Sequence, residues 1–152
     1  MQTILETLQS ICQKNNKTSE DYTYTFCHIL AGMIEENHDI TDFDESELIE
    51  ALNDIAGNYS FDFSIEFDGA EYRVIHESDI WCIYVDTIRD IVQDCYSDII
   101  NLDKVPSFIA VAIDWEATAH NAYADGYGYG HTFSSYDGSE LFTINHCIFR
   151  TN

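Results

Sequence analysis

Apolar residues recur every three or four positions along four stretches of the chain, the spacing of an amphipathic helix. These stretches predict helices over residues 2–14, 20–37, 45–56 and 77–101. We expect Thr18 or Ser19 to cap the second helix and Gly57 to end the third. The fourth is the longest, and its apolar stripe consists of Ile80, Tyr84, Ile88, Ile91, Cys95 and Ile99, thickened by Trp81 and Val92.

A strict alternation of apolar and polar residues from Phe61 to Phe67 instead predicts a strand with one buried face. Asp68-Gly69 follows at once and is a strong signal for a two-residue hairpin turn. Closing the hairpin there pairs Phe67 with Ala70, Ile65 with Tyr72, and Phe63 with Val74. The same register places Glu66 directly opposite Glu71, a like-charge pair that destabilises a ladder.

The C-terminal third is less regular. Residues 108–113 fit a strand or a helical lead-in equally well. Asp114 is the expected N-cap of a helix that runs to Ala124, and the glycine- and tyrosine-rich run 126–130 ends it. Two last strands are expected near residues 131–136 and 147–150. The turn between them is either tight, at Asp137-Gly138, or a longer loop through Asn145. We therefore predict an α+β fold, with amphipathic helices packed on a small antiparallel β-sheet built from hairpins.

Length and composition fit one acidic globular domain spanning residues 1–152. Apolar residues make up 45% of the chain, which argues against intrinsic disorder. There are 28 acids and 6 bases, giving a net charge of −22. Nucleic acid and anionic membrane are disfavoured as direct partners, because both are polyanions. The charge favours a cationic partner, and strongly cationic surfaces in cells are largely those that bind nucleic acid.

The acids are unevenly distributed. Fifteen of them lie between Glu20 and Glu71, a stretch with no Lys or Arg, whereas residues 106–152 contain five. A halophile protein would be acidic throughout. On the long helix, acids recur every four residues, which aligns them along one side at a cost of a few tenths of a kcal/mol per pair. The expected partner-binding surface comprises Glu45, Glu47, Glu50, Asp62, Glu66, Asp68, Glu71, Asp86, Asp90, Asp94 and Asp98.

Other kinds of site are poorly supported. The acids at 39–45 lack the glycine and the final glutamate of a calcium-binding EF-hand loop. Cys27-His28 and His146-Cys147 are adjacent pairs whose side chains point apart, so neither makes a zinc site by itself. The glycine-rich run follows a helix and precedes a strand, the reverse of a phosphate-binding loop. We expect no catalytic residue, no metal and no cofactor.

Cysteine usage and the N-terminus indicate the compartment. Five cysteines without a CxxC pair are typical of a reduced, cytoplasmic protein with buried thiols. The first residues lack a basic signal region, and no segment has the roughly 18 apolar residues that a membrane span needs. We expect the cytoplasm of a bacterial host.

The segment Ile113-Asp114-Trp115-Glu116-Ala117-Thr118-Ala119, the tyrosine- and glycine-rich region after it and Ile148-Phe149-Arg150 resemble the end of ArdA-like antirestriction proteins. Phages and mobile elements encode this family. The resemblance covers about 40 residues. It implies a non-catalytic DNA mimic that occupies a restriction-modification enzyme.

The expected function is thus inhibition of a host defence enzyme, of the restriction-modification, CRISPR or recombination nuclease type, through carboxylates that replace phosphates. The alternative is an immunity- or antitoxin-type protein that caps one basic partner. A homodimer would lengthen the negative surface and is compatible with either.

Overall fold

A computed structural model describes residues 3–15, 20–37, 39–95, 104–110 and 112–152. The helices in these ranges are α1 (Ile4–Lys14), α2 (Glu20–Asn37), η1 (Ile40–Asp42), α3 (Glu45–Asn58), α4 (Glu77–Cys95), α5 (Ser107–Ala110), α6 (Trp115–Ala124) and α7 (Tyr129–Phe133). The strands are β1 (Asp62–Phe67), β2 (Ala70–His76), β3 (Leu141–Thr143) and β4 (His146–Arg150).

The four strands form one antiparallel sheet in the order β1-β2-β4-β3. The α+β prediction is therefore confirmed. The predicted hairpin register is confirmed as well, including Phe63 opposite Val74 and Glu66 opposite Glu71. The turn is possible because Asp68 and Gly69 both adopt positive φ.

Helices cover both faces of the sheet. One face carries Phe63, Ile65 and Val74, which join a core shared with α1, α2 and α3. The opposite face carries Ile75 and Phe149, which pack with buried residues of α4, α6 and α7. Strand β4 lies between β2 and β3 and is buried on both faces.

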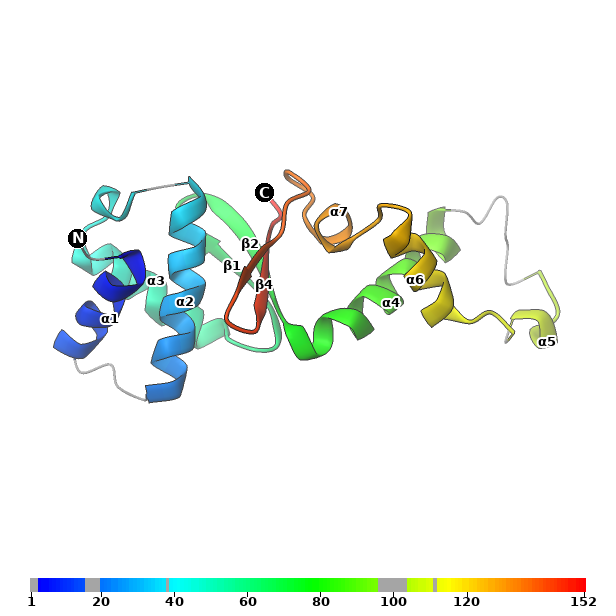
Figure 1. Ribbon diagram of the computed structural model, residues 1–152, viewed down its shortest axis with the longest axis horizontal. Coiled ribbons are helices and arrows are strands. Elements are labelled where there is room, and N and C mark those ends of the chain that lie inside the picture. Colours follow the sequence, from blue (N-terminus) through cyan, green and yellow to red (C-terminus); the bar gives the residue numbers. More distant parts are fainter. Residues whose placement is uncertain (1–2, 16–19, 38, 96–103, 111) are drawn as a thin grey trace.

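The molecule is elongated because α4 leaves the sheet without a loop and runs away from it (Figure 1). His76 is the last residue of β2 and Glu77 is the first of α4. The Nδ1 atom of His76 accepts a hydrogen bond from the backbone N–H of Ser78 at 3.1 Å. The chain passes through α5 and returns along α4 as α6. We call the unit from α4 to α7 the arm.

Two predictions about element boundaries need correction. Gly57 does not end α3, because the helix continues to Asn58 and the chain leaves it at Tyr59, whose ring packs against Phe63 at 5.6 Å between centroids. The strand predicted near 131–136 is wrong, because α7 occupies residues 129–133 and buries Phe133 against Phe149. The strand that forms a hairpin with β4 is β3, and β4 pairs with β2 on its other side.

The β3–β4 turn lies at residues 144–145, so of the two predicted turns the tight one at Asp137-Gly138 is wrong. Gly130 has a steric role in this region: a Cβ at this position would collide with the backbone oxygen of Gly138. Glycine is therefore required at position 130 by the close approach of the Gly138 backbone.

The remaining outcomes concern helix ends and exposure. The sequence of residues 108–113 is equally compatible with a strand and with a helix, and the structure places the first three of them, 108–110, in the short helix α5. Asp114 caps α6 as predicted, accepting from the backbone N–H of Ala117 at 3.0 Å. The stripe on α4 is buried only through Ile88, since Ile91 and Cys95 are exposed. The predicted capping at 18–19 and the last turn of the long helix lie outside the described residues.

The cysteines divide into two groups. Cys12, Cys27 and Cys147 are buried, as predicted, whereas Cys82 and Cys95 are exposed on α4. Burial raises the pKa of the Cys147 thiol to about 11. The Cys12 and Cys27 sulfurs lie 3.5 Å apart between α1 and α2, and burial together with this neighbour raises the pKa of Cys27.

Candidate functional site

Two groups of acidic residues are prominent on the described surface. The first surrounds a shallow hollow between α3 and the β1–β2 hairpin, with a volume of about 200 Å³. Its floor is apolar, formed by Ala51 and by the rings of Phe43 and Phe67, whose centroids lie 5.1 Å apart. We call this the acidic hollow. Its rim carries carboxylates from both elements: Glu47, Glu50, Asp54, Glu66 and Asp68.

Local structure explains why these carboxylates meet. Glu47, Glu50 and Asp54 are spaced three and four residues apart, which places them on one side of α3. Glu66 faces away from the hydrophobic core in the alternating pattern of β1, and Asp68 sits in the turn. Because α3 packs against β1, the two sets border one concave surface.

The second group is the acidic ladder of α4: Asp86, Asp90 and Asp94, all exposed. It lies on the arm, whereas the hollow lies on the lobe formed by α1 to α3 and the hairpin (Figure 1). Successive members are about 6 Å apart along the helix axis. Asp98, the fourth predicted member, lies outside the described residues.

Among the described residues, the predicted site residues Asp62, Glu45 and Asp86 each lie beside a base. Arg73 donates two hydrogen bonds to the carboxylate of Asp62, from Nε at 2.9 Å and from Nη2 at 2.7 Å. Lys14 lies 3.2 Å from Glu45. Arg89 lies 3.7 Å from Asp86, one turn along α4. The neighbouring base partly neutralises the charge of each of these carboxylates, and Asp62 contributes mainly to holding β1 to β2.

The pKa shifts agree with these contacts. Hydrogen bonds from Asn15 and then Lys14 lower the pKa of Glu45. The bond from Ser46, followed by the backbone N–H of Glu47, lowers the pKa of Asp44, the N-cap of α3. Glu45 and Asp44 therefore stay ionised under mildly acidic conditions. On the hairpin, hydrogen bonding to Asp62 raises the pKa of Arg73.

The hairpin tip concentrates charge further. Glu66 and Glu71 are exposed and directly opposed across β1 and β2. Glu71 is also fixed through its backbone, since its carbonyl accepts from the N–H of Thr151 at 2.8 Å and its N–H donates to the carbonyl of Asn152 at 3.2 Å. The like-charge pair is thus held in a rigid frame.

The sequence identifies the charges of the hollow but not its shape. Glu47, Glu50, Glu66 and Asp68 belong to the predicted surface, whereas Asp54 does not, although it lines the same rim. Its spacing from Glu47, seven residues or two turns, is the signal that could have identified it. The aromatic floor depends on Phe43 lying near Phe67, a tertiary contact with no local signal.

Within the ranges that the structure describes, no three His, Cys, Asp or Glu side chains are grouped to hold a metal ion. In the same ranges no helix is long and apolar enough to cross a membrane. Comparison with protein-family models, with curated proteins and with solved structures produced no match. The function must therefore be inferred from the residues themselves.

Proposed function

We propose that this protein inhibits a DNA-handling defence enzyme of a bacterial host by presenting carboxylates, in place of DNA phosphates, to the enzyme's basic DNA-binding site. The observation that supports this most is the rigid clustering of exposed carboxylates on two folded surfaces, the acidic hollow with its hairpin and the ladder on α4. Partner binding accounts for the retention of like-charge pairs that stability alone would remove.

The spacing of the ladder supports mimicry. One strand of duplex DNA carries a charge about every 3.4 Å of axis, so alternate phosphates are about 6.8 Å apart. Carboxylates four residues apart on a helix are separated by about 6 Å along the axis. A groove that binds alternate phosphates of one strand therefore meets Asp86, Asp90 and Asp94 at a similar interval.

Charge also sets the kinetics that we expect. A net charge of −22 steers the protein toward a positive groove and speeds association, and salt screens the effect within about 10 Å at 0.1 M. Action in the bacterial cytoplasm, where such enzymes meet DNA, fits the proposal, as does the resemblance of the C-terminal third to antirestriction proteins.

The test begins with capture of the tagged protein's partners from a bacterial lysate, washed across a salt series and identified by mass spectrometry. Recovery of a restriction, CRISPR or recombination nuclease that is lost as salt rises would name the target. Competition with labelled duplex DNA for that enzyme then measures inhibition. A target that binds this protein and DNA simultaneously would contradict mimicry.

Matched double variants sharpen the competition assay. Asp90→Asn with Asp94→Asn removes two ladder charges, and Asp125→Asn with Glu140→Gln removes two exposed charges elsewhere. Each pair changes the net charge equally. With about 0.7 kcal/mol per surface pair, the ladder variant should compete roughly tenfold less well. The control pair should compete almost as well as the parent.

One observation favours the alternative, an immunity-type protein that caps a single basic partner. The acidic hollow is concave with an aromatic floor, a shape that suits one Arg or Lys side chain better than a whole groove. This function predicts one tight partner with no general competition against DNA. Recovery of one small partner that is not a nuclease would support it.

A further inference from the structure

We propose that a groove on the arm binds a bulky apolar side chain, of the size of Leu, Phe or Trp, which the protein target carries among its basic residues. The inference rests on the proposed function, because it takes the target to be a cationic protein surface. It adds an uncharged anchor to a recognition that otherwise depends on charge alone.

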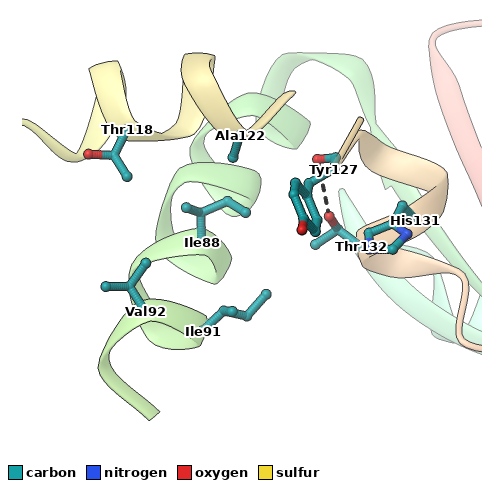
Figure 2. A pocket seen from close by; sticks show the side chains of 8 residues that line it. All are labelled: Ile88, Ile91, Val92, Thr118, Ala122, Tyr127, His131 and Thr132. Atoms are coloured by element: carbon teal, nitrogen blue, oxygen red, sulfur yellow. Dashed lines mark hydrogen bonds between the residues drawn. The ribbon is translucent and has the colours of Figure 1, made fainter. Parts of the chain in front are cut away.

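The groove lies between α4, α6 and α7 and has a volume of about 300 Å³ (Figure 2). Ile88, Ile91 and Val92 of α4 form one wall, and Ala122 of α6 lies across from them. Tyr127, on the segment between α6 and α7, closes one end. The volume is at the lower end of the range for ligand pockets, which suits one side chain better than a cofactor.

The groove is open to a partner. Ile91 is 36% exposed and Tyr127 is 49% exposed, although both are large apolar or aromatic side chains. The backbone carbonyl of Tyr127 accepts a hydrogen bond from the hydroxyl of Tyr84, whose side chain is fully buried. This hydrogen bond fixes the position of the Tyr127 backbone at one end of the groove. The fold itself therefore holds this end of the groove in place.

The neighbourhood of the groove identifies the chemistry of its occupant. None of the described residues that line it is acidic, yet Asp90 is adjacent to Ile91 in the chain and Asp94 is three residues beyond Ile91 on α4. Residues three apart are neighbours on a helix surface. Both carboxylates therefore belong to the same part of α4 as Ile91, within one helical turn of it, about 5.4 Å along the axis. Charge complementarity favours Lys or Arg next to the apolar side chain that occupies the groove and disfavours nucleic acid or anionic lipid.

The anchor has a measurable consequence. Burying a large apolar side chain strengthens binding by roughly tenfold or more, and this part of the affinity does not weaken with salt. The charge-dependent part falls as salt rises. The complex should therefore retain residual affinity at salt concentrations that abolish binding by a purely electrostatic decoy.

The test uses the full chain and synthetic peptides acetyl-Lys-Lys-X-Lys-Lys-amide, in which X is Trp, Leu or Ser, titrated by calorimetry from low to high salt. We expect the Trp and Leu peptides to bind roughly tenfold more tightly than the Ser peptide, and this ratio to persist at high salt. Equal affinities for all three peptides would overturn the proposal. No DNA or enzyme is involved, so failure here is distinguishable from failure of DNA competition.

Two groove variants and one control locate the effect. Ile91→Ser and Tyr127→Ser each remove part of the groove lining, and both replace exposed side chains, so the fold should survive. Phe142→Ser removes a 61% exposed side chain from β3, outside the groove. The groove variants should reduce the ratio of Trp to Ser affinity several-fold, and the control should not.

Retention of the ratio in both groove variants would refute the assignment. Sedimentation of the parent and the same variants tests whether the groove is instead occupied by another copy of this chain. A parent dimer that becomes monomeric on Ile91→Ser would show that the groove is a self-interface, which also overturns the proposal.

Discussion

Replacing Glu71 with Lys should stabilise the fold while weakening partner binding. Glu71 and Glu66 are exposed and directly opposed on β2 and β1. The substitution turns a repulsive cross-strand pair into an attractive one. If the pair was retained for recognition, stability and binding must change in opposite directions.

The expected magnitude follows from the geometry of the ladder. Opposed charges on neighbouring strands contribute roughly 0.2–1 kcal/mol in either direction. Removing one repulsion and adding one attraction should raise the free energy of unfolding by about 1 kcal/mol. For a domain of this size the midpoint of thermal unfolding should rise by about 3 °C. Screening by salt should reduce the gain.

Urea unfolding followed by circular dichroism measures the change at low and at high salt. Glu140→Lys is the matched control, since it changes the net charge equally at an exposed site outside the Glu66–Glu71 pair. Glu66→Lys should match the gain of Glu71→Lys, and the double variant should gain less than their sum, because two lysines repel. A Glu71→Lys protein no more stable than the control would refute the reasoning.

Three further predictions address the rest of the molecule. Ellman's reagent should titrate two thiols in the native protein, Cys82 and Cys95, and all five after unfolding, because the other three are buried; fast reaction of more than two would contradict the packing. Burial lowers the pKa of His146 in the folded protein, so as pH falls the unfolded chain binds a proton at this residue before the folded chain does. The contribution of His146 to the free energy of unfolding is therefore fully present above about pH 6.5. Below that pH it falls by at most about 1.4 kcal/mol per pH unit. The free energy of unfolding is measured by urea titration at a series of pH values for the parent and for His146→Asn, and the difference between the two curves should give this slope. Identical pH dependence in the two proteins would count against the role of His146. Gly130→Ala should destabilise by about 1–3 kcal/mol, because the new methyl group collides with the backbone of Gly138. Gly57→Ala is the reference variant in the same urea titrations, because a Cβ at Gly57 meets open space and alanine favours the helix more than glycine does. If the Gly130→Ala protein were as stable as the Gly57→Ala protein, the predicted collision with Gly138 would be contradicted.

Local patterns predicted the elements whose partners are close in sequence. The hairpin register follows from two-residue periodicity and the Asp68-Gly69 turn, which together occupy one short continuous segment. The α6 cap follows from Asp114 alone. In each case the deciding interaction lies within a few residues, so no knowledge of the remaining chain is needed.

The errors share the opposite property. Residues near Phe133 include tyrosine, threonine and phenylalanine, which favour strands, yet they form a helix that packs Phe133 on Phe149. Exposure of Ile91 depends on where α6 and α7 lie against α4. The acidic hollow likewise needs Phe43 beside Phe67. Tertiary contacts decide these features, and they carry no local signature.

The order of strands has a consequence for folding. Strands β1 and β2 meet across a two-residue turn, whereas Val74 of β2 must find Ile148 of β4, 74 positions later. The arm must form or loop out in between, and distant pairings of this kind slow folding. Until β4 arrives, β2 presents an open edge carrying Val74 and Ile75, which neighbouring chains can pair with. Losses during overproduction should therefore occur before the sheet closes, and slower synthesis should recover more folded protein.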